Sequence, residues 1–306
     1  MAGHGNSTRA IWFALGANLM IAIAKGVAAY VTRSGAMLAE TVHSLADCGN
    51  QLLLLLGLRQ ARAPVSAAHP LGSGKAIYFW SFLVAVMLFT VGGMFSLYEG
   101  VHKLQHPEPL RKWWWAVGVL VFAIGAESVS MRACLQEVAK ARGGRTMWRW
   151  FRESRQAELV VIFGEDLAAL AGLVFALCAI VATVATGNPL WDAVGTILIG
   201  VLLIVVAVFV AIQVKAMLIG QGVEPARQAQ MLAFLEARPE IDRVLNLITF
   251  QLGNEAMVSV QATMRERADV AALLAGIDTV ERALKAAFPE VRFSFFEPDT
   301  ARAVAA

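Results

Sequence analysis

The stretch LVVIFGEDLAALAGLVFALCAIVATVATGNPLWDAVGTILIGVLLIVVAVFVAIQVKAML, residues 159–218, decides the fold class of this chain. It consists of two apolar segments, 159–186 and 190–218, which flank a Gly-Asn-Pro tripeptide at 187–189. A helix needs about 20 consecutive apolar residues to cross the hydrocarbon core of a bilayer, and both segments exceed that length. Because Gly, Asn and Pro favour turns, the stretch predicts two transmembrane helices joined by a tight connection.

Further apolar segments of similar length precede this pair, at 10–31, 35–58, 77–101 and 113–137. The chain is 58% hydrophobic and 16% charged, whereas about a quarter of the residues in an ordinary soluble domain are charged. We interpret the first segment as a retained helix, because it is too long for the core of a signal peptide. The sequence therefore predicts an all-α membrane domain over residues 1–220, a bundle of six transmembrane helices.

Basic residues gather in alternate links between these segments. The link after 58 contains Arg59, Arg62 and Lys75, and the link after 137 contains five arginines between 142 and 155. Basic loops stay on the cytoplasmic side of a membrane, so we expect both termini in the cytoplasm. The start of the chain has no Arg-rich amphipathic presequence, which favours a bacterial inner (cell) membrane.

The chain after Leu218 changes character, because charged residues return and the long apolar segments stop. Its hydrophobic pattern predicts a helix, two strands, a second helix and a third strand, at 224–238, 243–251, 256–264, 269–287 and 291–297. The tetrapeptide LGNE at 252–255 is typical of a hairpin turn between the first two strands. Residues 221–306 are therefore predicted to form a small α+β cytoplasmic domain of ferredoxin-like type, suited to dimerisation with a second copy.

Composition also excludes two other roles. The net charge of +3 is small and no basic and aromatic run resembles a nucleic-acid platform, so nucleic acid is not an expected partner. Cys48, Cys134 and Cys178 lie in or beside apolar segments, are odd in number and lack C-x-x-C spacing. We interpret them as helix packing residues rather than disulfides or metal ligands.

Ionisable side chains are expensive in hydrocarbon, so those inside the apolar segments are candidates for function. His43 and Asp47 are four residues apart, which places both side chains on one face of a helix. Imidazole nitrogen and carboxylate oxygen are both zinc ligands, so this pair can share one divalent ion. The alternative is a structural pair that only joins helices by hydrogen bonding.

Glu165 and Asp166 supply two more carboxylates, near the start of another apolar helix. Adjacent helical residues project about 100° apart, so both cannot point directly at one ion. One of them is therefore expected to be a metal ligand. The other is expected to support that ligand from outside the coordination sphere or to carry protons. The alternative is a solvated helix end.

Glu127 has two open interpretations, a group behind the metal site or half of a buried ion pair with Lys25, and we favour the ion pair. The glycines at 92, 93, 195 and 200 indicate close helix packing rather than chemistry. No H-E-x-x-H motif or nucleophile elbow occurs, so the sequence does not indicate a membrane enzyme.

Four stretches of the chain resemble a known family. SGAMLAETVHSLADCGNQLLLLLGLR at 34–59 and HPLGSGKAIYFWSFLVAVMLFTVGGMFSLYEGVHKL at 69–104 are similar to the second and third helices of cation diffusion facilitators. VVIFGEDLAALAGLVFA at 160–176 and TGNPLWDAVGTILIGVLL at 186–203 resemble the fifth and sixth helices of the branch typified by zinc transporter nine. The resemblance covers nearly the whole chain.

This resemblance implies a homodimer of six-helix subunits that exchanges zinc, or a related divalent metal, for protons by alternating access. In the family, the second and fifth helices each provide a pair of metal ligands. The first pair corresponds to His43 and Asp47, and the Asp of the second pair to Asp166. Many members place His or Asp four residues earlier, where this chain has Ile162, so the fourth ligand would be Glu165, water or another group.

Two further departures concern accessory sites. His69 matches one member of a family site in the link between the second and third helices, but Ser73 replaces the next His, so this site is expected to be weak or absent. No His or Cys follows Cys178, so the tail lacks the soft ligands with which some relatives sense zinc. Its expected role is dimerisation.

The combined interpretation is a divalent-metal exporter with zinc as the leading candidate for its transported ion. With His43 neutral and two carboxylates ionised, the site would hold a charge of about −2, which a divalent cation cancels. On the return step, protons would take the place of the cation. Two alternatives remain: the same fold with iron, manganese or cobalt as the ion, since carboxylates favour harder metals, and a non-transporting partner subunit, suggested by Ile162.

Overall fold

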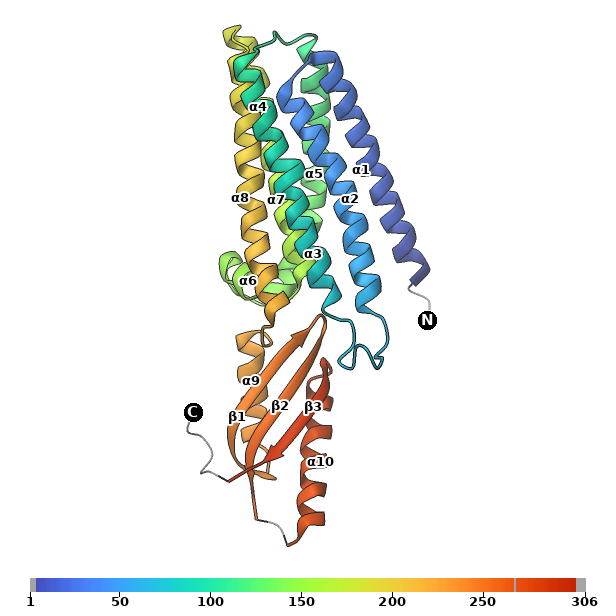
Figure 1. Cartoon of the computed structure of the whole chain (residues 1–306), viewed down its shortest axis with the longest axis vertical. Helices are drawn as coiled ribbons and strands as arrows, with labels where there is room; N and C mark the ends of the chain where they lie inside the picture. Colours follow the sequence, from blue (N-terminus) through green and yellow to red (C-terminus); the bar gives the residue numbers. More distant parts are fainter. Residues whose placement is uncertain (1–3, 267, 301–306) are drawn as a thin grey trace. The chain divides into compact units, whose positions relative to one another are not determined.

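The structure, a computed structural model, describes residues 4–266 and 268–300. Long helices form the first part of the chain, and a small mixed unit follows (Figure 1). In order, the elements are α1 (His4–Thr32), α2 (Gly35–Ala61), α3 (Ala76–Met87), the π-helix η1 (Leu88–Met94), α4 (Phe95–Gln105), α5 (Trp113–Arg142), α6 (Met147–Glu153), α7 (Ala157–Thr186), α8 (Leu190–Ile219), α9 (Pro225–Glu236), β1 (Ile241–Leu252), β2 (Glu255–Met264), α10 (Val270–Ala287) and β3 (Val291–Pro298).

The chain divides into two compact units. Of the described residues, the first unit contains 4–57, 80–146 and 158–214, and the second contains 58–79, 147–157, 215–266 and 268–300. The first unit is a helical bundle whose core includes Leu120, Leu173, Ile180, Ile199 and Leu203, from α5, α7 and α8. In water, burial of each of these side chains would stabilise the bundle by about 1.5–3 kcal/mol. In lipid there is no hydrophobic driving force between helices, so these side chains stabilise the bundle through close packing.

Within the described residues, four helical stretches are long and apolar enough to cross a membrane: Ala76–Gln105, Trp113–Arg142, Ala157–Thr186 and Leu190–Ile219. A shorter apolar stretch runs from Asn18 to Thr32 in α1. The helix α2 has the length of a span but carries Glu40, His43 and Asp47 in its interior. Each of the six segments predicted from the sequence therefore forms a helix. Length and apolar composition identify four of these helices as candidate membrane spans.

The third predicted segment is one continuous helical stretch whose middle turn widens into the π-helix η1. A Cβ atom on Gly93 of η1 would lie 2.5 Å from Ile204 Cγ1, and one on Gly200 of α8 would lie 2.8 Å from the Leu97 backbone nitrogen. Only glycine allows the two helices to approach this closely. The interpretation of Gly93 and Gly200 as packing residues is confirmed.

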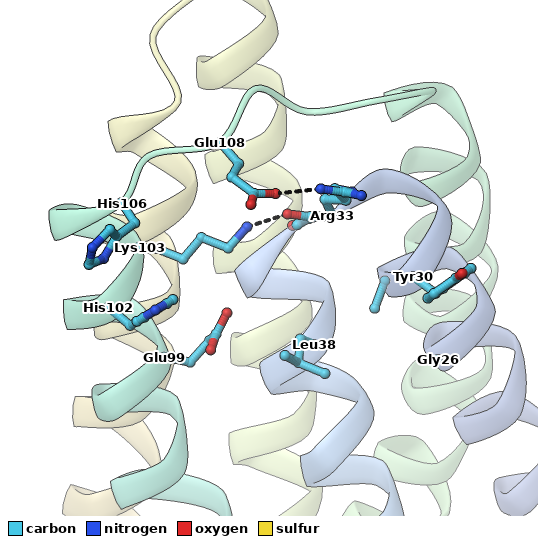
Figure 2. Close-up of a pocket in the computed structure, with 11 residues that line it drawn as sticks. Gly26, Tyr30, Arg33, Leu38, Glu99, His102, Lys103, His106 and Glu108 are labelled. Atoms are coloured by element: carbon cyan, nitrogen blue, oxygen red, sulfur yellow. Dashed lines mark hydrogen bonds and ion pairs between the residues drawn. The ribbon is translucent and has the colours of Figure 1, made fainter.

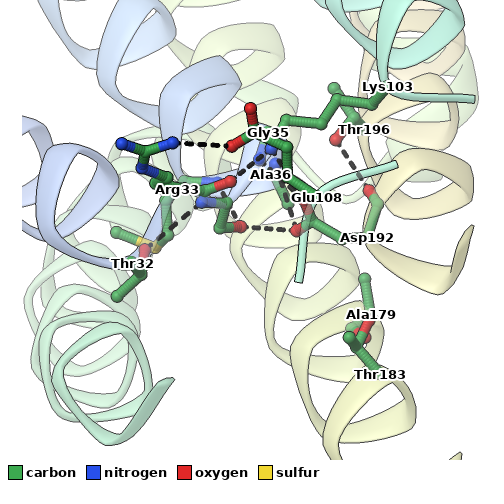
Figure 3. Close-up of polar contacts among 12 residues, drawn as sticks. Thr32, Arg33, Gly35, Ala36, Lys103, Glu108, Ala179, Thr183, Asp192 and Thr196 are labelled. Carbon is green, nitrogen blue, oxygen red and sulfur yellow. Dashed lines mark hydrogen bonds and ion pairs between the residues drawn. The ribbon is translucent and has the colours of Figure 1, made fainter. Parts of the chain in front are cut away.

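The links 33–34, 106–112 and 187–189 all lie at one end of the bundle, which we call the short-link end. There, Asp192 of α8 caps the N-terminus of α2 (Figure 3). Its carboxylate accepts hydrogen bonds from the Gly35 amide at 2.7 Å, the Ala36 amide at 3.4 Å and the Ser34 hydroxyl at 2.5 Å. Lys103 Nζ lies 3.9 Å from Asp192 Oδ2. A carboxylate at a helix N-terminus satisfies free amides and complements the helix dipole.

The second unit contains a three-stranded sheet in the order β1-β2-β3. Strands β1 and β2 are antiparallel, and β2 and β3 are parallel through the crossover helix α10. The predicted hairpin is present: Leu252 pairs with Glu255, and Gly253 takes a φ of +68° that favours glycine. The five predicted elements of this α+β unit occur in the predicted order, with boundaries that differ by at most two residues.

The helices α9 and α10 contact each other and the sheet (Figure 1). Alternate residues of β2, namely Val258, Val260 and Ala262, are buried in their shared core with Met231 of α9 and Val280 of α10. This alternation is that of a strand with one face buried, and it agrees with the strand predicted at 256–264. The short helix α6 was not predicted from the sequence, because its seven residues are too few to establish a hydrophobic period.

The link between α2 and α3 contacts the hairpin within the second unit. The Tyr78 hydroxyl accepts a hydrogen bond from the Gly253 amide at 3.0 Å. A Cβ atom on Gly74 would lie 2.1 Å from the Leu252 carbonyl oxygen, so the two backbones touch. Lys75 Nζ lies 5.1 Å from the centre of the Phe250 ring. These contacts tie Gly74, Lys75 and the first turn of α3 to the hairpin of the sheet.

Candidate metal site

The predicted ligand pair lies on one buried face of α2. His43 is fully buried, the Asp47 side chain is 17% exposed, and His43 Nδ1 lies 3.5 Å from Asp47 Oδ1. Asn50, a further three residues along, is fully buried on the same face. The π-helix η1 passes beside this face, because a Cβ atom on Gly92 would lie 4.0 Å from His43 Nδ1. Such π-turns occur frequently at functional sites.

This face contains polar atoms that are buried without a hydrogen-bond partner. They are both ring nitrogens of His43, Oδ1 of Asp47 and Oδ1 of Asn50. Each such atom costs about 1–3 kcal/mol when it is left unpaired in the interior. Nitrogen and oxygen atoms of these types are ligands for divalent transition metals. The unsatisfied atoms of α2 therefore suit a cation better than they suit packing alone.

The helix α7 contributes Glu165 to this region. Asn50 Nδ2 donates a hydrogen bond of 2.6 Å to Glu165 Oε1, and Glu165 is only 8% exposed. Asp166 lies against α5 instead, where the Ser130 hydroxyl donates to its two oxygens at 3.3 and 3.4 Å. The structure thus joins Glu165, rather than Asp166, to the polar face of α2. Both carboxylates stand well inside α7, so the alternative of a solvated helix end does not apply.

The four predicted ligands do not converge on one point. Over residues 4–266 and 268–300, no group of three or more His, Cys, Asp and Glu side chains is close enough to hold an ion together. His43 and Asp47 are adjacent, Glu165 connects to them through Asn50, and Asp166 is the outlying member. Closure around an ion would need side-chain movement, principally of Glu165 and Asp166.

Two residues were not assigned to the site from the sequence. Asn50 and Ser130 are the hydrogen-bond partners of Glu165 and Asp166. The spacing of Asn50, three residues after Asp47 on the same helix face, was a usable signal. Nothing in the sequence marked Ser130. Ile162, which stands at the position of a family ligand, is 39% exposed and therefore does not fill the interior in place of a ligand.

The favoured ion pair between Lys25 and Glu127 is wrong. Lys25 Nζ instead lies 3.1 Å from Glu40 Oε2 and donates a 2.7 Å hydrogen bond to Ser44 Oγ, with the Lys25 and Glu40 side chains fully buried. Glu40 and Ser44 are one turn apart on α2, so a single ammonium group reaches both. The packing of α1 against α2 offers two acceptors to Lys25.

A second polar region lies at the short-link end, around a cavity of about 380 Å³ (Figure 2). Its charges are largely paired: Arg33 Nη1 lies 3.3 Å from Glu108 Oε2, and Lys103 Nζ donates to the Arg33 carbonyl. His102 of α4 and His106, which follows the last residue of that helix, have ring centroids 5.0 Å apart. The acidic and basic groups of this cavity balance each other, so it does not form a negative site comparable to the α2 face.

Apolar helices long enough to cross a bilayer, with ionisable side chains enclosed among them, define an integral membrane protein of the transport class. The family model described as the cation efflux transmembrane domain matches residues 11–219. The chain therefore belongs to the cation efflux family, and the predicted membership of the cation diffusion facilitators is confirmed. Members of this family are transporters of metal ions and not enzymes.

The similar proteins include the mitochondrial proton-coupled zinc antiporter SLC30A9 of Mus musculus, 31% identical over 72% of this chain and 40% of that protein. Metal tolerance protein C4 of Arabidopsis thaliana is 33% identical over 78% of this chain and 52% of its own length. Magnetosome protein MamM of Paramagnetospirillum magneticum is 28% identical over 31% of this chain and 32% of that protein. The chain thus spans about half the length of these relatives or less. Its resemblance to the zinc transporter nine branch is confirmed.

Proposed function

We propose that this protein exports a divalent transition metal ion, zinc first among the candidates, in exchange for protons. The substrate would bind between α2 and α7, with His43 and Asp47 as ligands from α2 and Glu165 as the ligand from α7. Asp166 would act behind Glu165 or complete the site after a movement of α7. The names of the zinc antiporter and metal tolerance relatives support both the cation and the exchange.

The observation that carries this proposal is the set of unpartnered atoms on the buried face of α2. His43 offers two free ring nitrogens, and Asp47 offers a free oxygen 3.5 Å from the nearer of them. An arrangement with so many unsatisfied atoms is expensive unless a ligand or water occupies it for part of the cycle. A zinc ion accepts nitrogen and oxygen ligands in tetrahedral geometry, which suits a His and two carboxylates with water as the fourth ligand.

Proton exchange follows from the same charges. Two carboxylates beside a neutral imidazole form a site of about −2 charge, which is costly in a low-dielectric interior unless a cation neutralises it. A divalent metal ion provides that neutralisation in one direction, and protons on the carboxylates provide it in the other. Rocking of helices around a fixed site would then expose it alternately to the two sides of the membrane.

The architecture we propose around this site comprises six transmembrane helices over residues 1–220 and a ferredoxin-like cytoplasmic domain over 221–306. The mixed order β1-β2-β3 with a parallel β2–β3 crossover supports the ferredoxin-like assignment. Ile248 and Phe295, both 54% exposed, pair with Ser259 from either side on the sheet face opposite the buried residues of β2. This uncovered apolar pair supports a homodimer formed through the tail. A bacterial inner membrane with both termini cytoplasmic is the setting that the basic links favour.

The test is ion flux into proteoliposomes that contain the purified full chain and an internal pH indicator. Zinc, iron(II), manganese(II) and cobalt(II) are offered separately, and metal uptake and proton movement are recorded together. We expect zinc to move fastest and protons to move in the opposite direction. Asp47→Ala should abolish the flux, whereas His102→Ala, at the cavity of the short-link end, should retain it.

The outcomes separate the alternatives. Faster flux with manganese, iron or cobalt would keep the transporter and change its substrate. Zinc transport by Asp47→Ala at the wild-type rate would place the site elsewhere. No flux with any of the four ions, from a chain that still binds zinc and remains folded, would favour a non-transporting partner subunit.

A further inference from the structure

The buried ion pair of Lys25 and Glu40 lies on the same helix face as the candidate metal site. Glu40 precedes His43 by three residues and Asp47 by seven, and these spacings place all three side chains along one side of α2. At about 1.5 Å of rise per residue, Glu40 stands roughly 10 Å closer than Asp47 to the short-link end. The proposed transport reaction gives no role to this pair.

Glu40 is only half satisfied. Its Oε2 accepts the Lys25 ammonium at 3.1 Å, while its Oε1 is buried without a hydrogen-bond partner. This free oxygen faces α7, where a Cβ atom on Gly172 would come within 2.4 Å of it. Gly172 and Glu165 are seven residues apart on α7, so they share one face of that helix. The Glu40 carboxylate therefore occupies the same α2–α7 seam as the candidate metal site, nearer the short-link end.

The surroundings of the pair connect it to the cavity at that end. Gly26, the neighbour of Lys25 in the chain, and Leu38 of α2 both line the cavity of about 380 Å³ (Figure 2). Glu99 of α4 lines the same cavity. Lys25 and Glu40 themselves are fully buried and do not line the cavity, but along α2 the Glu40 carboxylate lies between the candidate site and the end of the bundle that holds it.

We propose that Glu40 is a second, transient ligand for the metal ion as it passes between the central site and the short-link end. The Lys25 ammonium occupies this carboxylate whenever no metal is there. Lys25 keeps an alternative acceptor in Ser44 at 2.7 Å, so it can release Glu40 without losing all of its hydrogen bonds. This inference rests on the proposed transport function, because it adds a second binding position for the transported ion.

The charge of Lys25 explains why such a site would be transient. An ammonium on one oxygen of a carboxylate repels a dication that approaches the other oxygen, and it neutralises the carboxylate again once the dication has left. The metal ion would therefore dwell briefly at Glu40 and move on. Without Lys25, the Glu40 carboxylate would retain the metal ion. Without Glu40, the positive charge of Lys25 would not be neutralised and would repel the metal ion.

The test compares Lys25→Met, Glu40→Gln and the double variant in the full chain, by zinc titration calorimetry, zinc flux in proteoliposomes and thermal unfolding in detergent. Lys25→Met should bind zinc about tenfold more tightly and transport it more slowly, whereas Glu40→Gln should lose flux. The double variant has no unpaired buried charge, so it should regain wild-type stability. Its flux should nevertheless remain about fivefold or more below wild type. Ser44→Ala keeps the ion pair but removes the alternative acceptor of Lys25, so it should slow the flux. Thr41→Val, which removes a hydroxyl bonded to the Met37 carbonyl on the same helix, is the matched control and should retain most of the flux.

A purely structural ion pair gives a different result, because the double variant would then recover flux together with stability. That recovery, or unchanged zinc affinity in a folded Lys25→Met variant, would overturn the inference. If Lys25→Met does not fold, the double variant decides alone. The Asp47→Ala variant separates this inference from the proposed function. If Asp47→Ala still transports zinc, the proposed function fails at its central site. If Asp47→Ala loses flux while the double variant is fully active, only the role of Glu40 is rejected.

Discussion

The Asn50 side-chain amide donates a hydrogen bond of 2.6 Å to Glu165 Oε1, and this contact joins α2 to α7 inside the helical bundle. Because the amide nitrogen is used in this way, Asn50 Oδ1 points elsewhere and has no partner of its own. A neutral amide thus holds the α7 carboxylate beside the helix that carries His43 and Asp47. The hydrogen bond determines which carboxylate of α7 is placed to meet an ion bound to α2.

Glu165→Gln and Asp166→Asn should therefore differ in their effect on zinc binding. We expect Glu165→Gln to weaken zinc binding by about tenfold or more, because it removes a charged ligand from the α2–α7 seam. Asp166→Asn should have the smaller effect, since Asp166 bonds to Ser130 on α5. Titration calorimetry of both variants in detergent measures the difference. The reverse order of effects would return the ligand role to Asp166, as the family resemblance implies.

Replacement of His43 by Asp should change the ion preference of the protein. A third carboxylate in place of the imidazole makes the site harder, so we expect transport of manganese or cobalt to rise relative to zinc. The measurement is flux with each ion offered at the same concentration. His102→Asp is the matched control, because it makes the same substitution on α4 at the cavity of the short-link end. An unchanged ion profile in His43→Asp would argue against direct ligation by His43.

Asp192→Ala should destabilise the helical bundle without changing the site chemistry. The substitution leaves the buried amides of Gly35 and Ala36 without their acceptor and Lys103 without its nearest carboxylate. Unpaired buried amides cost about 1–3 kcal/mol, so the thermal unfolding temperature in detergent should fall. Asp192→Asn retains an acceptor oxygen and should lose less. Equal stability of the two variants would show that the cap does not depend on the side-chain oxygen.

The ion pair between Arg227 and Glu290 should make the tail sensitive to acid. The Arg227 guanidinium, bonded to Glu290 at 2.5 and 3.1 Å, lowers the pKa of that carboxyl group below its ordinary value. A carboxyl group with a lowered folded-state pKa stabilises the fold above its unfolded pKa of about 4.3, and this contribution is lost as pH falls through the folded value. Both side chains are partly exposed, so screening limits the effect to roughly 0.2–1 kcal/mol.

Hydrogen exchange of the β3 amides in the full chain measures this effect. Glu290→Gln should exchange faster than wild type at pH 7, and the two proteins should converge once pH falls below the lowered folded-state pKa, where Glu290 is protonated in both the folded and the unfolded state. Arg292→Gln, which removes the exposed ion pair between Arg292 of β3 and Glu255 of β2, is the control for a surface ion pair. A difference between wild type and Glu290→Gln that persists at low pH would assign it to packing rather than charge.

Most of the fold could be predicted because its determinants are local in the sequence. The positions of α1, α2, α5, α7 and α8 follow from runs of apolar residues, and the hairpin follows from its Gly-Asn turn. The short helix α6 and the π-helix η1 in the third segment were missed, because stretches of seven residues are too short to leave a periodic signal. The pair His43 and Asp47 was found because its spacing is a property of a single helix.

The sequence by itself determined that this is a membrane protein of the cation efflux family and that His43 and Asp47 share one face of α2, since hydropathy, helix spacing and family motifs are properties of continuous segments. Only the tertiary structure decided that Lys25 pairs with Glu40 rather than Glu127, and that Glu165 rather than Asp166 bonds to α2 through Asn50. These partners depend on how far each helix is rotated about its own axis. Adjacent residues differ by about 100° in direction, so a choice between neighbours or between two facing helices is made by packing and not by spacing along the chain.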